Sequence, residues 1–177
     1  MTIDFLMPKY VVSVDMFGDE VLSMESGATF SSCQCYRYTL WRRWSKGETV
    51  QFIGLNPSTA DATLDDPTIR RCIGFAKTWG FGSLIMTNLF AWRATQPKDM
   101  LSTIDPVGPD NDDALKVVYA HTALTVAAWG VYGAHLGRDK DVCKMFSRLH
   151  YLQLTKDGHP KHPLYLPATS RPLEWDF

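Results

Sequence analysis

TVQFIGLNPSTADATLDDPTIRRCIGFAKTWGFGSLIMTNLF, residues 49–90, is the stretch that decides the fold class. It begins with an apolar run at 50–55 and ends with a second run at 84–90. Between the runs, apolar residues recur at the spacing of one helix face: Ile69, Cys72, Ile73, Ala76 and Trp79. Near-continuous apolar strands separated by a helix are typical of a parallel sheet that is covered on both faces.

The helix in this stretch has its own start and stop signals. Asp66 is placed to cap the first turn, Pro67 suits the first helical position, and Gly80 can end the helix. The sequence therefore predicts a helix between residues 66 and 80.

The same alternation continues along the chain, with further apolar runs at 123–129 and 151–154. Helical spacing relates the residues before each run, which are Leu115, Val118, Tyr119 and Thr122, then Val142, Met145, Phe146 and Leu149. We predict one domain over residues 1–177. Its core at 49–177 is an α/β three-layer sandwich around a four-stranded, mainly parallel sheet.

Residues 1–48 are predicted to form a β-rich N-terminal extension. Val11, Val12 and Val14 precede a turn signal at residues 17–19, and the segment 36–44 alternates like a strand.

Composition narrows the function classes. The chain has 177 residues, 45% of them apolar and 21% charged, which fits one globular domain rather than a disordered chain. The net charge of −1 supplies no general basic field, so any contact with nucleic acid needs a local patch of basic residues.

No apolar run approaches the ~20 residues of a membrane span. The N-terminus lacks the layout of a signal peptide, and the four cysteines are spread out, so we expect a reduced, cytoplasmic protein.

The polar residues that suggest chemistry follow the predicted strands. Loops at 54–68, 87–97, 129–133 and 158–167 are rich in small and polar residues. Because ligands of open parallel sheets bind at the carboxyl ends of the strands, we predict the site there.

Several of these residues also have a structural interpretation. The Asn56–Pro57 pair can simply initiate a turn, Asp66 suits a helix cap, and His162 lies in a proline-rich turn. Asn88 interrupts an apolar run, and a buried amide at that position favours contact with a ligand. Arg37, Arg42 and Arg43 fit a solvated strand face or a surface that contacts phosphates.

Other chemistries find little support. Cys33 and Cys35 supply half of a metal site, without a second pair at ligand spacing. The sequence contains no GxGxxG, no P-loop and no GxSxG. We expect neither a metal nor a cofactor.

The segments YRYTLWR, GLNPSTADATLDDPTIRR, TNLFAWRATQP and GHPKHPLYLP resemble a family of small bacterial and phage proteins designated domain of unknown function 1643. The resemblance covers roughly residues 30–170. In motif layout the chain is also similar to the uracil-DNA glycosylase superfamily.

The second resemblance implies roles for individual residues. The superfamily's first motif, Gly-x-(Asp or Asn)-Pro, matches GLNP and implies that Asn56 positions or activates the attacking water. The strand-end asparagine that reads the pyrimidine falls at Asn88, and the histidine that stabilises the departing base falls at His162. The WG pair ending at Gly130 resembles the end of the third strand.

The chain departs from the superfamily in ways that suggest a larger base. Small residues at 58–60 replace the bulky residue that helps to exclude thymine, the closing motif is HPLYLP, and the first loop is acidic. The resemblance thus implies room for a hydroxymethyl or sugar substituent on the pyrimidine.

We therefore expect a monofunctional DNA glycosylase that hydrolyses the N-glycosidic bond of a modified pyrimidine and leaves an abasic site. It would act as a monomer on DNA, in defence against phages with modified bases. A monofunctional mechanism is expected because, apart from Lys161 beside His162, no lysine lies in the site loops. The expected catalytic residues are Asn56, Asp61, Asp66 and His162. The expected substrate-binding residues are Pro57, Ser58, Thr59, Asp65, Arg70, Asn88, Arg93 and Gly130.

Two other functions suit the same residues. One is a module that binds a nucleotide or modified base without chemistry. The other is an enzyme on free nucleosides or nucleotides, with Asp65, Asp66 and Arg70 contacting sugar and phosphate.

Overall fold

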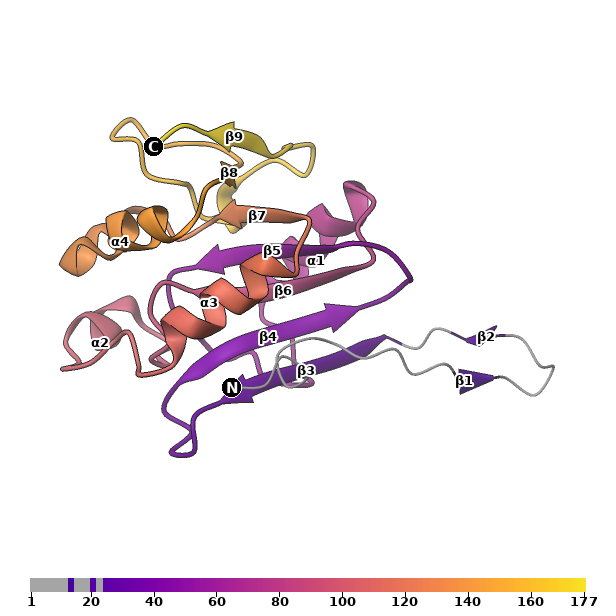
Figure 1. The fold of residues 1–177 in the computed structure, drawn as a ribbon, viewed down its shortest axis with the longest axis horizontal. Helices are drawn as coiled ribbons and strands as arrows, with labels where there is room; N and C mark the ends of the chain where they lie inside the picture. The colour runs from indigo at the N-terminus through magenta and orange to yellow at the C-terminus, as the bar shows by residue number, and fades with distance from the viewer. Residues whose placement is uncertain (1–12, 15–19, 22–23) are drawn as a thin grey trace.

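The computed structural model describes residues 13–14, 20–21 and 24–177, and its main feature is a mixed seven-stranded sheet (Figure 1). The strands lie in the order β3-β4-β6-β5-β7-β8-β9. Their bounds are Glu25–Phe30 (β3), Arg37–Arg43 (β4), Thr49–Gly54 (β5), Ser83–Asn88 (β6), Leu124–Ala127 (β7), Leu149–Tyr151 (β8) and Leu173–Trp175 (β9).

The α/β class is as predicted, but the sheet is larger than the expected four strands. β5 pairs in parallel with β6 and β7, and β7 pairs in parallel with β8. β4 then joins β6 in antiparallel pairing, β3 joins β4, and β9 joins β8. Residues 25–43 of the predicted extension are therefore part of the main sheet, because β4 satisfies the edge of β6.

The central strands coincide with the predicted apolar runs, since β5 and β6 are buried along their whole length. The fourth strand was predicted at 151–154, whereas β8 ends at Tyr151. Leu152 instead packs into the core just beyond the strand, and Leu154 forms an isolated bridge with Pro160.

The helix α1, Pro67–Thr78, has the predicted ends. The Asp66 side chain accepts a hydrogen bond from the Ile69 amide at 2.8 Å, and Gly80 follows with a φ of +89°. Three further helices are α2 (Pro97–Leu101), α3 (Asn111–Ala120) and α4 (Arg138–Met145). α4 is shorter than predicted, because Phe146 is already extended and Leu149 belongs to β8.

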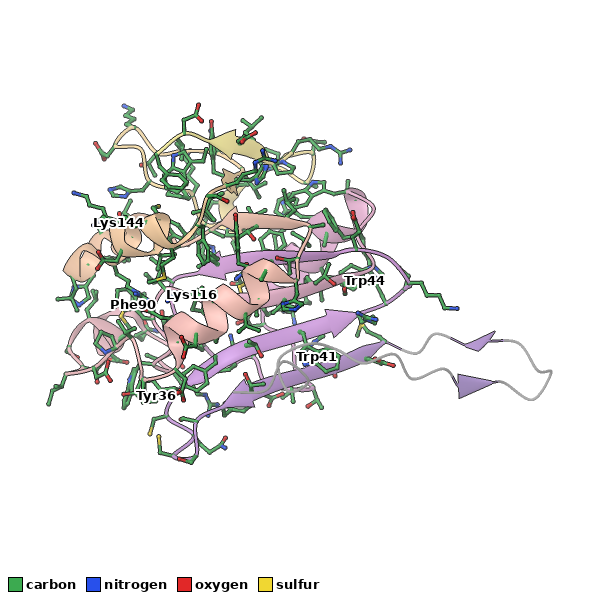
Figure 2. All side chains as sticks on the ribbon, in the orientation of Figure 1. Tyr36, Trp41, Trp44, Phe90, Lys116 and Lys144 are labelled. Atoms are coloured by element: carbon green, nitrogen blue, oxygen red, sulfur yellow. The ribbon has the colours of Figure 1, made fainter. Side chains whose placement is uncertain are left out.

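Two apolar layers cover the two faces of the sheet. One lies under α1 and contains Phe52 and Phe75. The other lies under α2, α3 and α4 and contains Phe90 and Leu115. Figure 2 shows side chains filling these layers, with Phe90 inside and Lys116 and Lys144 pointing outward from α3 and α4.

Near the N-terminus, β1 (Ser13–Val14) and β2 (Glu20–Val21) pair as a separate antiparallel ribbon. The predicted strand residues Val11 and Val12 and the turn at 17–19 lie outside the described residues. Within the described part of the chain, no helix is long and apolar enough to cross a membrane.

Candidate functional site

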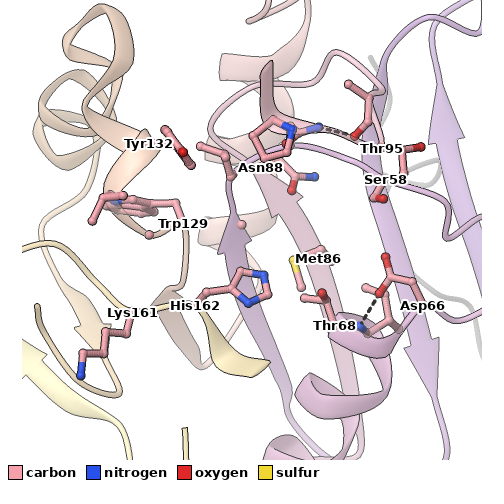
Figure 3. Close-up of a pocket in the computed structure, with 18 of the residues that line it drawn as sticks. Ser58, Asp66, Thr68, Met86, Asn88, Thr95, Trp129, Tyr132, Lys161 and His162 are labelled. Carbon is pink, nitrogen blue, oxygen red and sulfur yellow. Dashed lines mark hydrogen bonds between the residues drawn. The ribbon is translucent and has the colours of Figure 1, made fainter. Parts of the chain in front are cut away.

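A cavity of about 460 Å³ lies at the carboxyl edge of the parallel strands. Residues that follow β5, β6, β7 and β8 all contribute to its wall, as predicted from the strand-end loops (Figure 3). The chain runs from β5 outward to β6 and then crosses to β7 on the other side. A cavity beside the strand at which the direction reverses is the usual binding place of such sheets.

Asn88 provides an uncommitted amide in the cavity wall. The residue is 3% exposed, and its Nδ2 has no hydrogen-bond partner among the described residues. Gly54 makes this position possible, because a Cβ on Gly54 would lie 2.8 Å from Asn88 Oδ1. Since a buried amide without a partner is costly, Asn88 is suited to bind a polar ligand.

The backbone that carries Asn88 is held from the helical layer. Asn111, fully buried at the start of α3, donates from Nδ2 to the carbonyl oxygens of Asn88 at 3.1 Å and Leu89 at 2.9 Å. Arg138 Nε donates to the same Leu89 oxygen at 2.9 Å, and its guanidinium pairs with Asp112. The strand end is thus fixed while the Asn88 side chain stays uncommitted.

The Asn56 side chain lines the cavity, and its hydrogen bonds fix the orientation of its amide group. Nδ2 donates to the carbonyl oxygens of Pro57 at 3.0 Å and Ala94 at 2.8 Å. Because both partners are acceptors, the amide nitrogen must point toward them, which leaves Oδ1 as the acceptor for a ligand. Pro57 itself is buried and fixes this turn, because its carbonyl also accepts from the Ala94 amide.

Asp66 and Arg37 place opposite charges in the wall. Asp66 caps α1 and also lines the cavity, so the structural and the functional interpretations both apply. Arg37 is 2% exposed, donates to the Ala60 carbonyl, and has a buried Nε without a partner among the described residues. Burial lowers the pKa of Arg37 to about 10, and the Asp66 charge opposes this shift.

The other strand arginines are structural. Arg42 is 1% exposed, and its Nε donates to Asp65 Oδ1 at 2.8 Å. Its remaining nitrogens donate to the carbonyl oxygens of Trp41, Asp61 and Leu64. Arg43 is buried as well, so the interpretation of these arginines as a solvated strand face is wrong. The physical reason for Arg37 and Arg42 is that the acidic first loop folds over β4 and binds both of them.

His162 brings an imidazole from the far end of the chain into the cavity. The half-buried side chain precedes the short 3-10 helix η3 (Pro163–Tyr165), and its Nδ1 accepts from the Leu164 amide at 3.4 Å. Burial lowers the pKa of His162, with Asp66 acting in the opposite direction. The ring is therefore neutral at pH 7, with its proton on Nε2.

The remaining wall combines aromatic and small residues. Trp129 is buried and lines the cavity, while Tyr132, from the 3-10 helix η2 (Val131–Gly137), is 52% exposed at its rim. Gly130 adopts a φ of +72° between them. Lys161 also lines the cavity, but its amine extends away from His162 (Figure 3).

Six predicted residues do not line this cavity, namely Pro57, Thr59, Asp61, Asp65, Arg70 and Arg93. Asp61 closes a local turn, accepting from the amides of Thr63 and Leu64 at 2.8 Å, and these bonds lower its pKa. Asp65 is bound by Arg42, and the exposed Arg70 donates to the Asp65 carbonyl.

Two of the six, Thr59 and Arg93, line a neighbouring cavity. Ser58 lines both cavities.

Sequence reasoning did not assign Arg37, Thr68, Met86, Thr95, Trp129 or Tyr132 to the site, although all of them line the cavity. Thr68 and Thr95 follow the predicted strands within the quoted loops, so their position was a usable signal. No such signal placed Arg37 in the site, because its position depends on β4, which pairs with β6 far along the chain.

No group of three or more histidine, cysteine, aspartate or glutamate side chains is arranged to hold a metal ion within the described ranges. The polar side chains that line the cavity instead include two amides, an imidazole, several hydroxyls, a lysine, and one carboxylate with a guanidinium. Such a set can orient water, donate to an anion and stabilise a cationic centre.

Comparison with known proteins yields a family but no characterised relative. Neither the curated proteins nor the solved structures give a significant match. A family model described as a protein of unknown function, DUF1643, matches residues 37–164, which is more than two thirds of the chain and includes β4 through His162. The chain therefore belongs to the DUF1643 family.

Proposed function

We propose that the protein is a DNA glycosylase that hydrolyses the N-glycosidic bond of a modified pyrimidine. The observation that carries this proposal is the convergence of Asn56, Asn88 and His162 on one cavity, with the Asn88 amide nitrogen buried and unpartnered within the described structure. A flipped base brings the carbonyl and amino groups that such an amide needs.

His162 suits the departing base. Cleavage of the bond builds negative charge on the base, and a neutral imidazole can donate to the base oxygen that carries it. The Leu164 amide occupies Nδ1, so Nε2–H is the donor that His162 offers to a ligand. Asn88 lies in the same cavity and holds the base by its polar edge.

Asn56 and Asp66 suit the sugar side of the reaction. The free Oδ1 of Asn56 can accept from a water molecule and orient it toward the sugar carbon. Asp66 is the acidic residue among those that line the cavity, and its charge stabilises the oxocarbenium-like centre or accepts the proton of the water. Asp61 is left out of this mechanism, because its carboxylate closes a turn outside the cavity.

The volume supports a base larger than uracil. The cavity of about 460 Å³ lies within the range of ligand sites, and Ser58 and Ala94 contribute small side chains to its wall. The position of the cavity at the carboxyl ends of the parallel strands β6-β5-β7-β8 also suits the binding of a flipped base.

The test is single-turnover base release from duplexes containing uracil, hydroxymethyluracil, hydroxymethylcytosine, glucosylated hydroxymethylcytosine or mismatched thymine. Release from at least one modified base is expected. His162→Ala should lower the rate by ~10²–10³-fold, as for removal of one donor to a developing anion. Asn56→Ala should abolish the ordered attack of water.

His121→Ala is the matched control, because His121 is an exposed histidine at the end of α3 whose imidazole bonds to the Val117 carbonyl, away from the cavity. Its rate should equal that of the wild type. Full activity of His162→Ala and Asn56→Ala would refute the assignment of roles. Tight binding of a modified base without any abasic product would favour the non-catalytic module instead.

A further inference from the structure

A second cavity of about 430 Å³ adjoins the candidate active site. Ser58, Ala94 and Thr95 line both cavities and so form a shared wall. The rest of the second cavity comes from Gln34 and Cys35 in the loop between β3 and β4, from Thr59 in the loop after β5, and from Trp92 and Arg93 after β6. A ligand that fills the first cavity is therefore in reach of the second.

Arg93 supplies a fixed cation to this cavity. Its Nη1 donates to the Gln34 carbonyl at 2.9 Å, and its guanidinium carbon lies 4.9 Å from the centre of the Phe30 ring. The backbone amide of Arg93 also donates to the Cys35 carbonyl at 3.0 Å. The planar guanidinium is thus held in one orientation, which suits recognition of an anion.

The two cavities differ in charge balance. In the first, Asp66 accompanies Arg37, whereas none of the eight residues lining the second is acidic. The hydrogen bond with Cys33 and burial raise the pKa of the Cys35 thiol, so that side chain is neutral as well. Ser58, Thr59 and Thr95 line the same cavity, and their hydroxyls can donate to the same ligand.

From this arrangement we infer that the second cavity binds the phosphate ester of the nucleotide whose base enters the first cavity. The inference rests on the proposed function. A guanidinium with hydroxyl donors and no acid matches a phosphate, and the sugar spans the wall formed by Ser58, Ala94 and Thr95. Arg93 therefore contacts the backbone of the substrate and not a substituent on its base.

The first experiment measures binding of a duplex that carries a tetrahydrofuran abasic analogue, so that the identity of the base is irrelevant. Arg93→Met should lower affinity by about 10- to 100-fold, as for a lost hydrogen bond to a charged group. It should also make the slope of log K against log salt shallower by about 0.9, because one phosphate contact is lost. Arg148→Met is the control, since Arg148 lies at the opposite end of β8 and pairs with Glu174.

The second experiment first changes only the DNA, so its result on the wild type does not depend on the folding of a variant. The phosphate on either side of the analogue is replaced by a neutral methylphosphonate, one at a time. One replacement should weaken binding of the wild type by a similar factor. The same replacement should have little further effect on Arg93→Met, because the two changes remove one interaction.

The source of the phosphate is decided by a parallel titration with a free deoxynucleoside monophosphate and with its nucleoside. In one outcome, the wild type prefers the monophosphate to the nucleoside and does not bind the duplex, and the preference is lost in Arg93→Met. That result would assign the cavity to free nucleotides and refute the DNA proposal. Unchanged affinity and salt slope in Arg93→Met, with base release intact, would refute the phosphate site alone. Additive effects of the variant and the methylphosphonate would also refute it.

Discussion

The first loop, residues 55–66, and the closing segment, residues 158–166, contribute opposite sides of the candidate site but are held in different ways. Buried arginines of β4 bind the first loop, since Arg37 donates to Ala60 and Arg42 to three positions between 61 and 65. The closing segment carries His162 on a short turn whose Leu164 and Tyr165 are exposed. Two buried arginines therefore hold the first loop, whereas the closing segment is held through its backbone, by bonds that join Pro160 to Gly130, Lys161 to Gln153 and Leu166 to Arg71.

The largest expected effect comes from removing the support of the first loop. Arg42→Ala leaves the Asp65 carboxylate and the carbonyl oxygens of Asp61 and Leu64 without their donor. We expect a loss of about 3–5 kcal/mol in the free energy of unfolding, measured by denaturant titration. Arg148→Ala removes an exposed pair with Glu174 and should cost less than about 1 kcal/mol. Equal losses in both variants would contradict the difference between the regions.

A smaller effect is expected where the first loop leaves β5. Gly54→Ala would place a Cβ 2.8 Å from Asn88 Oδ1 and 3.5 Å from Met86 Sδ. We expect destabilisation by about 1–3 kcal/mol together with weaker ligand binding, because Asn88 must move. The control is Gly74→Ala in α1, where a Cβ meets nothing within 4 Å and should stabilise the helix by about 0.5–1 kcal/mol. A Gly54→Ala protein with unchanged stability and binding would show that Asn88 is not constrained.

The smallest effect concerns the closing segment and its pH dependence. Burial holds the pKa of His162 below its usual value of 6.5. As the pH falls through 6.5 toward the folded-state pKa, the unfolded chain binds a proton that the folded chain does not, so stability decreases. His162→Gln should remove this part of the loss. Free energies of unfolding at about pH 7.5 and about pH 5.5 test it, and identical pH dependence in both proteins would contradict it.

Local chemistry explains which parts of the molecule could be predicted. α1 was predicted with both ends because Asp66, Pro67 and Gly80 are themselves the cap, the first turn and the stop. The convergence of Asn56, Asn88 and His162 was predicted because the carboxyl ends of parallel strands share one edge.

The failures have a common cause in long-range pairing. β3 and β4 join the sheet through β6, which lies some forty residues further along the chain, and no local pattern records that partner. Arg42 is buried because the loop around residues 61–65 binds it. Asp65 in turn is bound by Arg42, and Asp61 closes a local turn. The fourth strand was predicted too far along the chain because Leu152 is apolar, although it packs into the core beyond the end of the strand.

The order of these parts along the chain has a consequence during synthesis. The ribosome makes β4 and its arginines before the loop that they hold, and it makes β6, with which β4 pairs, after that loop. His162 emerges after nearly all other residues of the cavity wall. Under the proposed function, an incomplete nascent chain therefore lacks the group that receives the departing base, and it cannot damage DNA before its own fold is complete.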